Sequence, residues 1–433
     1  MRRCLALVFA ISLLASCRPA EERTTIRFWA MGREAEVVGA LIPAFEREHP
    51  GLRVEVQQVP WSAAHEKLLT AYAADALPDV CQLGNTWVPE FAELNALAPL
   101  DRDVAASKIV DRRDYFEGIW DTNVIDGVTY GVPWYVDTRL MFYRKDLLAA
   151  AGYDAPPKTW AEWSAAMAAI KRQRGKDRYA ILLPLNEFEQ LLSLALQQDD
   201  SLLRDDGRGN LTSPGFRRAL AYYVGMFEND WAPPMSETQI SNVWDEFFNG
   251  LFVFYVSGPW NIREFRKRAP KGLEDVWGTA PLPGPSGLGA GIAGGTSLVL
   301  FRNSPRKREA WLFVEYLSRP DVQRKFHAEI GDLPPRRSTW DDHALRDDPY
   351  AAAFRDQLER VKPTPKVMEW ERIVQEMRLA SERVVRGGQS QDRAVRDLNA
   401  TVDAILEKRR WVMAQRAEAN QSREPAAPAS AAP

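Results

Sequence analysis

The sequence has few cysteines, no excess of positive charge and no second long apolar run, and each shortage excludes a class of protein. Its three cysteines are Cys4, Cys17 and Cys81, and the first two lie in an N-terminal apolar segment, so no intrachain disulfide framework supports the mature fold. Lys and Arg number 56 against 59 Asp and Glu, for a formal net charge of -3, which argues against a nucleic-acid partner. No later run reaches the roughly 18 apolar residues that a transmembrane helix needs.

Signatures of catalysis and metal binding are also missing. The four histidines are His49, His65, His327 and His343, and none has the spacing of metal ligands. His49 and His65 fall in polar helical segments, where we expect solvated side chains. Residues 289–294 match the Gly-x-Gly-x-x-Gly pattern of dinucleotide sites by letters, but they precede a strand instead of opening a helix after one. We therefore expect no cofactor, no metal ion and no enzymatic activity.

The N-terminus has the pattern of an export signal. Arg2 and Arg3 precede a short apolar stretch at 5–14, which is too short to span a membrane stably. The next residues, up to Cys17, resemble the lipobox of bacterial lipoproteins, which implies that residues 1–16 are removed as a signal peptide and that Cys17 is lipidated. An ordinary secretory signal with an incidental cysteine is the alternative. Residues 17–24 then serve as anchor and linker.

Strand and helix patterns alternate after this segment. Residues 25–30 and 52–56 alternate between polar and apolar side chains, which predicts strands, and 79–83 predicts a third. Between these strands, apolar residues recur at helical spacing over 36–48 and 66–72. This order predicts an α/β fold with a largely parallel sheet, whose ligands bind in loops beyond the carboxyl ends of the strands.

The rest of the chain predicts three more strands, several helices and a flexible tail. The strands are expected at 140–143, 251–256 and 297–301. The helices are expected at 160–174, 187–198, 214–229, 243–250, 308–317, 321–329, 368–386 and 390–416. Residues 413–433 are expected to form the tail, because their last part is rich in Ala, Pro and Ser and has no core-forming pattern.

Tryptophan is unusually frequent, with 15 residues against 12 tyrosines. Those in helical stripes, Trp160, Trp163 and Trp311, are expected in the core. Six others lie at strand ends or in loop-like polar sequence: Trp29, Trp61, Trp87, Trp134, Trp260 and Trp370. Packing explains any single one of them more easily, but six beside polar residues suit a sugar cleft. A pyranose offers an apolar face to an indole and a rim of hydroxyls to polar side chains.

Two neighbouring carboxylates, Glu187 and Glu189, have more than one explanation. They favour the start of a helix through its dipole. Paired acids also serve glycosidases, which need two carboxyl groups across a sugar. A third reading is that one of them accepts hydrogen bonds from sugar hydroxyls without any chemistry.

A series of short motifs, in order and spacing, makes residues 25–411 similar to the carbohydrate-binding extracytoplasmic solute-binding proteins of ABC importers. This group includes the maltose- and trehalose/maltose-binding proteins. The motifs lie at residues 26–29, 41–46, 77–80, 131–135, 142–148, 157–160, 258–260 and 294–297. No single motif is specific, whereas their order and spacing together are.

The resemblance implies a two-lobed periplasmic-binding-protein fold, with crossing hinge segments and a ligand cleft between the lobes. Lobe one comprises 25–137 with 296–340, and lobe two comprises 138–295 with 341–412. The implied function is a monomeric receptor that binds a mono- or oligosaccharide and delivers it to the permease subunits of an ABC transporter. A lipid anchor would hold it on a membrane outside the cytoplasm, in the periplasm or on the cell surface. A surface glycan hydrolase and a sugar-sensing lipoprotein are the alternatives.

The resemblance also implies roles for particular residues. Trp260 corresponds to a stacking tryptophan, Tyr135 and Asp137 to a hinge-side aromatic and acid, and Glu187 and Trp370 to an acid and a late aromatic of lobe two. Asn85 lies near where many relatives carry an aspartate. The expected ligand-binding set is Trp29, Glu34, Trp61, Asn85, Trp87, Tyr135, Asp137, Glu187, Trp260, Gly294, Gly295, Thr296 and Trp370.

Overall fold

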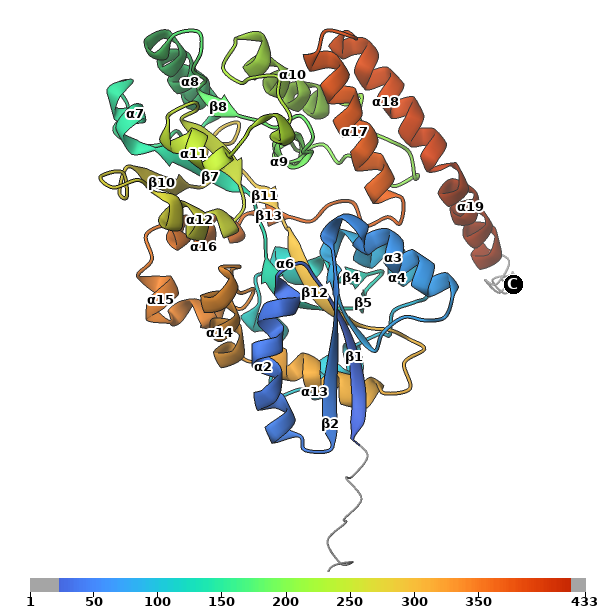
Figure 1. Ribbon diagram of the computed structural model, residues 1–433. Coiled ribbons are helices and arrows are strands. Elements are labelled where there is room, and N and C mark those ends of the chain that lie inside the picture. The colour runs from blue at the N-terminus through green and yellow to red at the C-terminus, as the bar shows by residue number, and fades with distance from the viewer. Residues whose placement is uncertain (1–22, 422–433) are drawn as a thin grey trace, which may run out of the picture.

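The computed structural model describes residues 23–421, which form two α/β lobes (Figure 1). The predicted signal peptide, Cys17 and the end of the predicted tail lie outside this range. Lobe one is built on a five-stranded sheet, drawn in the lower half of Figure 1. Its strand order is β2 (Leu52–Val59), β1 (Thr24–Met31), β3 (Val80–Gly84), β12 (Gly295–Leu300) and β6 (Val132–Val136).

The first three strands of this sheet form where the sequence predicts them. Strand β1 pairs in parallel with β2 and β3, and helices α2 (Glu34–Glu48) and α3 (Trp61–Ala73) make the two connections. Strand β12 runs antiparallel to β3 and to β6, so the sheet is mixed instead of largely parallel. The direction of β12 could not be read from its own residues, because it depends on where the chain returns from lobe two.

Lobe two is built on a four-stranded sheet, drawn in the upper half of Figure 1. Its order is β10 (Trp277–Ala280), β7 (Leu140–Arg144), β9 (Phe254–Ser257) and β8 (Ile181–Leu182). Strand β9 is buried throughout, as its continuous apolar sequence predicts for a strand covered on both faces. The helices packed in its main core are α8 (Trp160–Arg174), α9 (Glu189–Leu196), α10 (Pro214–Glu228), α17 (Trp370–Val385) and α18 (Gln391–Ile405).

Shorter elements complete both lobes. The helices are α4 (Val88–Glu93), α5 (Asp101–Ala106), α6 (Glu117–Asp121), α7 (Lys145–Ala150), α11 (Val243–Phe248), α12 (Trp260–Arg268), α13 (Lys307–Leu317), α14 (Pro320–Ile330), α15 (His343–Arg346), α16 (Ala351–Leu358) and α19 (Glu407–Gln421). The 3-10 turns are η1 (Asn85–Trp87), η2 (Arg112–Asp114), η3 (Glu237–Gln239) and η4 (Arg337–Asp341), and the remaining strands are β4 (Val124–Ile125), β5 (Val128–Thr129), β11 (Gly291–Ile292) and β13 (Val361–Lys362). No helix of the described residues is long and apolar enough to cross a membrane.

The C-terminal region differs from the sequence prediction in two ways. The helix expected over 390–416 is two helices: Leu406, with φ of −86° and ψ of 4°, caps the end of α18, and α19 begins at Glu407. Apolar spacing continues on both sides of Leu406, so periodicity alone does not show the interruption. Helix α19 then continues through 413–421, where the sequence predicted a flexible tail. This stretch is rich in Ala and Gln, which are good helix formers.

Three segments cross between the lobes. The first joins β6 to β7, the second leads from β11 into β12, and the third carries the chain from Leu333, which bridges to Val136, towards β13. Figure 1 shows β11 and β13, which pair in parallel, between the two sheets. The two-lobed fold with crossing hinge segments is therefore confirmed.

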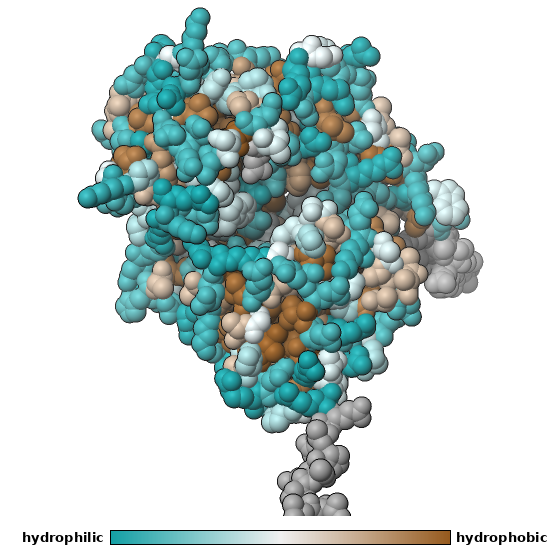
Figure 2. All heavy atoms as spheres, viewed as in Figure 1, coloured by the Kyte–Doolittle hydropathy of each residue, from teal (hydrophilic) through white to brown (hydrophobic). Residues whose placement is uncertain are grey.

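Polar contacts reinforce this connection at one side of the molecule. Arg409 of α19 pairs with Glu93 of lobe one and, at 2.8 Å, with Glu369 of lobe two. Thr86 Oγ1 donates to Glu371 Oε1 at 2.7 Å, again from lobe one to lobe two. Figure 2, drawn from the same side as Figure 1, shows mostly hydrophilic residues, with a hydrophobic patch in the lower half.

Candidate functional site

Glu34 is the centre of a polar network on the lobe-one side of the junction. It opens α2 directly after β1, and its side chain is almost buried, with the residue 7% exposed. Its Oε1 atom accepts hydrogen bonds from the Tyr135 hydroxyl at 2.6 Å, from Trp61 Nε1 at 3.3 Å and from Gln82 Nε2 at 3.4 Å. Three donors therefore fix one oxygen, and Oε2 has no hydrogen-bond partner among residues 23–421.

An aromatic edge adjoins this network. Trp61 is 38% exposed, and its ring meets the ring of Trp87 edge-on with centroids 6.0 Å apart. His65 lies 5.1 Å from Trp87, and its Nε2 is 2.5 Å from Glu90 Oε2. The hydrogen bond to Glu90 raises the pKa of His65 against the opposing effect of burial. His65 is therefore a partly buried, ion-paired side chain, and the solvated position expected from sequence is wrong.

The hinge backbone lies beside these side chains. Gly295 has φ of +137°, and a Cβ there would lie 2.3 Å from the Tyr135 carbonyl oxygen, so this register requires glycine. Thr296 pairs across the sheet with Tyr135 on one side and with Gly84 on the other, and its buried hydroxyl has no partner in the described chain. The side-chain amide of Asn85 donates to the carbonyl of Ala293. Asn85 thus holds the crossing segment instead of pointing freely towards a ligand.

Arg139 organises the other side of the junction. It lies between β6 and β7 and pairs with Asp137 and, at 2.7 Å, with Glu189. Its guanidinium also lies 4.7 Å from the centroid of Trp260. A Cβ at Gly258 would lie 1.9 Å from Cζ3 of Trp260, so the indole folds back onto this glycine. A sugar that stacks on Trp260 must therefore share the ring with Arg139 or displace its side chain.

The remaining acid of the predicted set, Glu187, lies just before α9. Gln190 Nε2 donates to its carboxylate Oε2 at 2.5 Å. Its negative charge contributes, after those of Asp137 and Glu189, to the raised pKa of Arg139, an effect that burial opposes. Glu187 is therefore part of the same electrostatic cluster as the hinge-side acid.

Burial shapes the ionisation of this cluster. It raises the pKa of Asp137 to about 6, although the Arg139 guanidinium acts in the opposite direction. It also holds the pKa of Asp332 well above its ordinary value, with the nearby charges of Glu34 and Asp137 adding to the effect. The junction carries more carboxyl groups than cations, so it disfavours an anionic ligand.

Three of the predicted tryptophans lie elsewhere. Trp370 is 1% exposed in the core of lobe two, and Trp134 is buried in the core of lobe one, where it stacks on Phe326. Trp29 packs against a second core of lobe one, with Lys67 Nζ 4.8 Å from its ring centroid. The expectation of a ligand-facing indole is wrong for Trp370, which is buried in the core of lobe two, and unsupported for Trp29, which packs against the core of its own lobe with Lys67 beside its ring.

The structure brings together the other predicted residues and adds several that the sequence reasoning missed. Brought together are Glu34, Trp61, Asn85, Trp87, Tyr135, Asp137, Glu187, Trp260, Gly294, Gly295 and Thr296. Missed were Gln82, Arg139, Glu189 as an ion-pair partner, Asp332 and Glu371. Arg139 had a usable signal, since it follows Asp137 by two residues in the predicted hinge. Asp332 had none, because it approaches the site only through the third crossing.

No group of three or more His, Cys, Asp or Glu side chains within residues 23–421 could hold a metal ion.

Comparison with known proteins agrees with this architecture. Residues 32–324 match the family of bacterial extracellular solute-binding proteins. The sugar-binding protein MalE from Xanthomonas citri is 66% identical in its solved structure, with a TM-score of 0.88 over 90% of this chain and 100% of that one. The diacetylchitobiose binding protein DasA of Streptomyces coelicolor is 25% identical over 324 residues, 74% of each chain. A lipoprotein of Streptomyces antibioticus is 26% identical over 383 residues, 83% of this chain and 82% of its own. The chain is a member of the bacterial extracellular solute-binding protein family.

Proposed function

We propose that this protein is the carbohydrate receptor of an ABC importer, and that it binds sugar between its lobes at the junction around Glu34 and Asp137. The observation that carries the proposal is the combination of fixed carboxylate oxygens with exposed indole surface. Glu34 Oε2 and Asp137 are acceptors for sugar hydroxyls, and Trp61 offers an apolar ring beside them.

The ligand that this site favours is a neutral oligosaccharide. The site disfavours uronic acids and sugar phosphates, because the burial that raises the pKa of Asp137 and Asp332 penalises an added anion in the same way. The Xanthomonas relative is named the sugar-binding protein MalE, DasA is named for diacetylchitobiose, and the sequence motifs resemble those of the maltose-binding proteins. Maltose is therefore the first ligand to test, with longer maltodextrins next.

A glycan hydrolase is the second candidate, and one observation favours it. A carboxyl group with its pKa raised to about 6, such as Asp137, is suited to general acid catalysis near neutral pH. Against it, Asp137 and Glu189 share the Arg139 guanidinium, which holds both as ion-paired carboxylates. Incubation of the protein with maltodextrin should release no reducing ends above a buffer control. Release that is lost in Asp137→Asn would establish the hydrolase instead.

The proposed address is the outer face of a membrane, reached through the lipid on Cys17. The related Streptomyces antibioticus protein is described as a lipoprotein, and the Cys17 context resembles a lipobox. Cys17→Ser should move the full-length protein from the membrane to the soluble extracytoplasmic fraction. Cys4→Ser is the matched control, since Cys4 lies inside the signal peptide and should leave the protein membrane-bound. Membrane retention of Cys17→Ser would contradict the anchor.

The proposal also covers the assembly. We assign 25–137 with 296–340 to lobe one and 138–295 with 341–412 to lobe two, and we propose that the receptor is a monomer that presents both lobes to the permease. A sugar-sensing lipoprotein would share this architecture, so cellular uptake separates the two. Deletion of the gene should abolish accumulation of the radiolabelled cognate sugar. Normal uptake by the deletion strain would favour the sensor.

The binding test is calorimetric titration of the mature chain with maltose, maltotriose, diacetylchitobiose and glucuronic acid at matched concentrations. We expect saturable binding of one or more of the neutral sugars and none of the uronic acid. Tighter binding of glucuronic acid than of any neutral sugar would overturn the charge argument.

A further inference from the structure

Arg139 joins two carboxylates that belong to different parts of the fold. Its Nη1 atom donates to Asp137 Oδ1, two residues earlier in the first crossing segment. Its Nη2 atom donates at 2.7 Å to Oε1 of Glu189, the first residue of α9. The Arg139 side chain is 11% exposed, so neither ion pair is a fully solvated surface contact.

Both acids are also held by contacts of their own. The backbone N–H of Asp137 donates to the Gly294 carbonyl at 3.1 Å, which ties the first crossing segment to the second. Glu189 Oε2 accepts a hydrogen bond from the Phe188 backbone N–H at 3.1 Å, so both of its carboxylate oxygens have donors. The guanidinium therefore binds carboxylates whose positions are already fixed.

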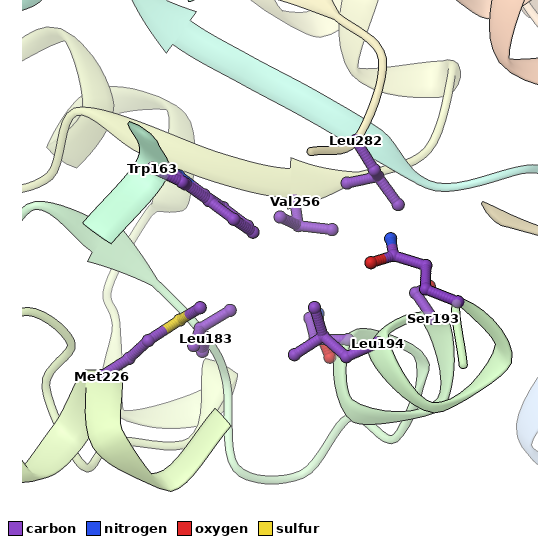
Figure 3. A pocket seen from close by; sticks show the side chains of 9 residues that line it. Trp163, Leu183, Ser193, Leu194, Met226, Val256 and Leu282 are labelled. Carbon is purple, nitrogen blue, oxygen red and sulfur yellow. The ribbon is translucent and has the colours of Figure 1, made fainter. Parts of the chain in front are cut away.

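Helix α9, which carries Glu189, is anchored in the core of lobe two. Figure 3 shows this packing: Leu194 of α9 lies across a small cavity from Trp163 of α8 and Met226 of α10. The pairing of Arg139 with Glu189 thus connects the hinge to a helix that is packed into the lobe.

Arg139 also lies over the ring of Trp260, with its guanidinium carbon 4.7 Å from the ring centroid. A sugar could take over this ring position only by breaking both ion pairs. Breaking a partly buried ion pair leaves charges without compensation, which is strongly unfavourable. The contacts therefore favour an arginine that stays in place when sugar binds and shares the indole with it.

Most of the charge around Asp137 has the same sign as its own. Burial raises the pKa of Asp137, the charges of Glu189 and Glu34 add to the effect, and Arg139 acts in the opposite direction. Without this cation, Asp137 would take up a proton at a higher pH. The other titratable groups that interact with Asp137 are those of Asp332 and Tyr135.

We propose that Arg139 is a positioning residue of the sugar site: it holds Asp137 and Glu189 in one ion-paired unit beside Trp260, and so keeps Asp137 a charged acceptor for sugar hydroxyls near neutral pH. The consequence for binding rests on the proposed function, whereas the ionisation of Asp137 can be measured without sugar. An arginine with a merely structural role would affect stability and affinity, but not the pH dependence of binding.

The binding test is calorimetric titration of Arg139→Met, from pH 5 to 9, with the neutral sugar that the parent protein binds most tightly. Loss of a neighbouring opposite charge raises the pKa of a carboxyl group by about one to three units. With a rise of about two, only about a tenth of Asp137 is ionised at pH 7. We therefore expect the affinity of Arg139→Met at pH 7 to be about tenfold below that of the parent, and to increase as the pH rises towards 9.

Arg139→Lys keeps the positive charge but loses the planar fork that reaches both carboxylates. It should bind more weakly than the parent, with nearly the same pH dependence. The same pH shift in Arg139→Met and Arg139→Lys, or in neither, would overturn the proposal.

Arg144→Met is the matched control. Arg144 ends β7, its side chain is 5% exposed, it pairs with Asp146 at 2.7 Å, and it lies 6.0 Å from the ring centroid of Phe247. Its replacement should lower stability and leave the pH dependence of sugar binding unchanged. A shift as large as that of Arg139→Met would show that the loss of any buried arginine suffices, which contradicts a specific role for Arg139.

Urea denaturation without sugar separates this proposal from the proposed function. The parent and Arg139→Met are each compared with their Asp137→Asn versions from pH 5 to 9. Because the folded-state pKa of Asp137 is raised, its ionisation lowers the free energy of unfolding as the pH rises, until the pH exceeds that pKa. The decline should level off above about pH 6 in the parent and at a higher pH in Arg139→Met.

The two possible failures are distinct. A parent protein that binds no sugar but shows the expected denaturation difference would contradict the proposed function and leave the role of Arg139 in the ionisation of Asp137 supported. A decline that levels off at the same pH with and without Arg139 would refute that role, whatever the parent binds.

Discussion

Replacing Glu34 with glutamine separates the structural role of this carboxylate from its proposed role in binding. All three hydrogen bonds that Glu34 receives converge on Oε1, from Tyr135, Trp61 and Gln82. In Glu34→Gln the amide oxygen can occupy the Oε1 position and keep these bonds in neutral form. A charge-assisted bond contributes about 1.5–3 kcal/mol and a neutral one about 0.5–1.5 kcal/mol, and only the 2.6 Å bond from Tyr135 is short, so we expect the free energy of unfolding to fall by about 1–2 kcal/mol.

We expect the same substitution to weaken sugar binding by more than it lowers the free energy of unfolding. The amide nitrogen replaces Oε2, so the acceptor that we propose for a sugar hydroxyl becomes a donor. Loss of a hydrogen bond to a charged group costs about 1.5–3 kcal/mol, or roughly ten- to a hundredfold in dissociation constant. Calorimetric titration measures this, and urea denaturation of the unliganded protein measures the stability change.

A control carboxylate distinguishes the two effects. Glu46 lies in lobe one, where it accepts a hydrogen bond from the Val54 backbone N–H at 3.0 Å and forms an ion pair with Arg23 at the surface. Glu46→Gln should lower stability slightly and leave sugar affinity unchanged. If Glu34→Gln binds the cognate sugar as tightly as the parent protein, Glu34 lies outside the ligand site and the reasoning fails.

Four further predictions follow from the same contacts. Trp260→Ala should weaken sugar binding by about 1–3 kcal/mol in calorimetry while the unliganded protein still melts cooperatively; normal binding would remove the indole from the site. Since burial raises the pKa of Asp137 to about 6, lowering the pH from 7.5 to 5 should protonate it and weaken binding about tenfold, and Asp137→Asn should bind with little change over this range. The pKa of His65 is raised by Glu90 above 6.5, so its stabilisation is complete below pH 6.5 and is lost as the pH rises through the folded-state pKa; denaturation of His65→Gln should therefore differ from the parent more at pH 6 than at pH 9, and an equal difference would refute the pairing. Cys81 is fully buried in β3, so reductant should leave both melting temperature and affinity unchanged, and a large shift would reveal an intermolecular bridge.

Local patterns sufficed for most of the elements but not for the sheet directions. Alternation over 25–30 and 52–56, with helical spacing between, corresponds to β1, α2 and β2 within one to three residues. The antiparallel direction of β12 follows from its return out of lobe two, which is a long-range fact absent from its own residues. Similarly, Leu406 interrupts a helix without disturbing the apolar spacing, so only the backbone conformation reveals the break.

The candidate site could also be predicted only where local sequence, or its likeness to the family, places a residue. The resemblance implied Asp137, which lies in a segment expected to cross between the lobes, and Glu34 was in the expected ligand-binding set; the structure places both at the junction. Trp370 was misplaced because an indole that opens a helix has the same sequence context whether it faces the core or a cleft. Arg139 had one local signal, its separation of two residues from Asp137, but its pairing with Glu189, 50 residues away, cannot be read from local sequence.

The most direct test of the central claim is a crystal structure of the mature chain with the tightest-binding neutral sugar from the titration. The account predicts sugar density between the two sheets, with hydroxyls at about 2.7–3.2 Å from a Glu34 or Asp137 carboxylate oxygen and a ring face against Trp61 or Trp260. Sugar bound outside this junction, or within it but in contact with none of these four side chains, would contradict the proposed site.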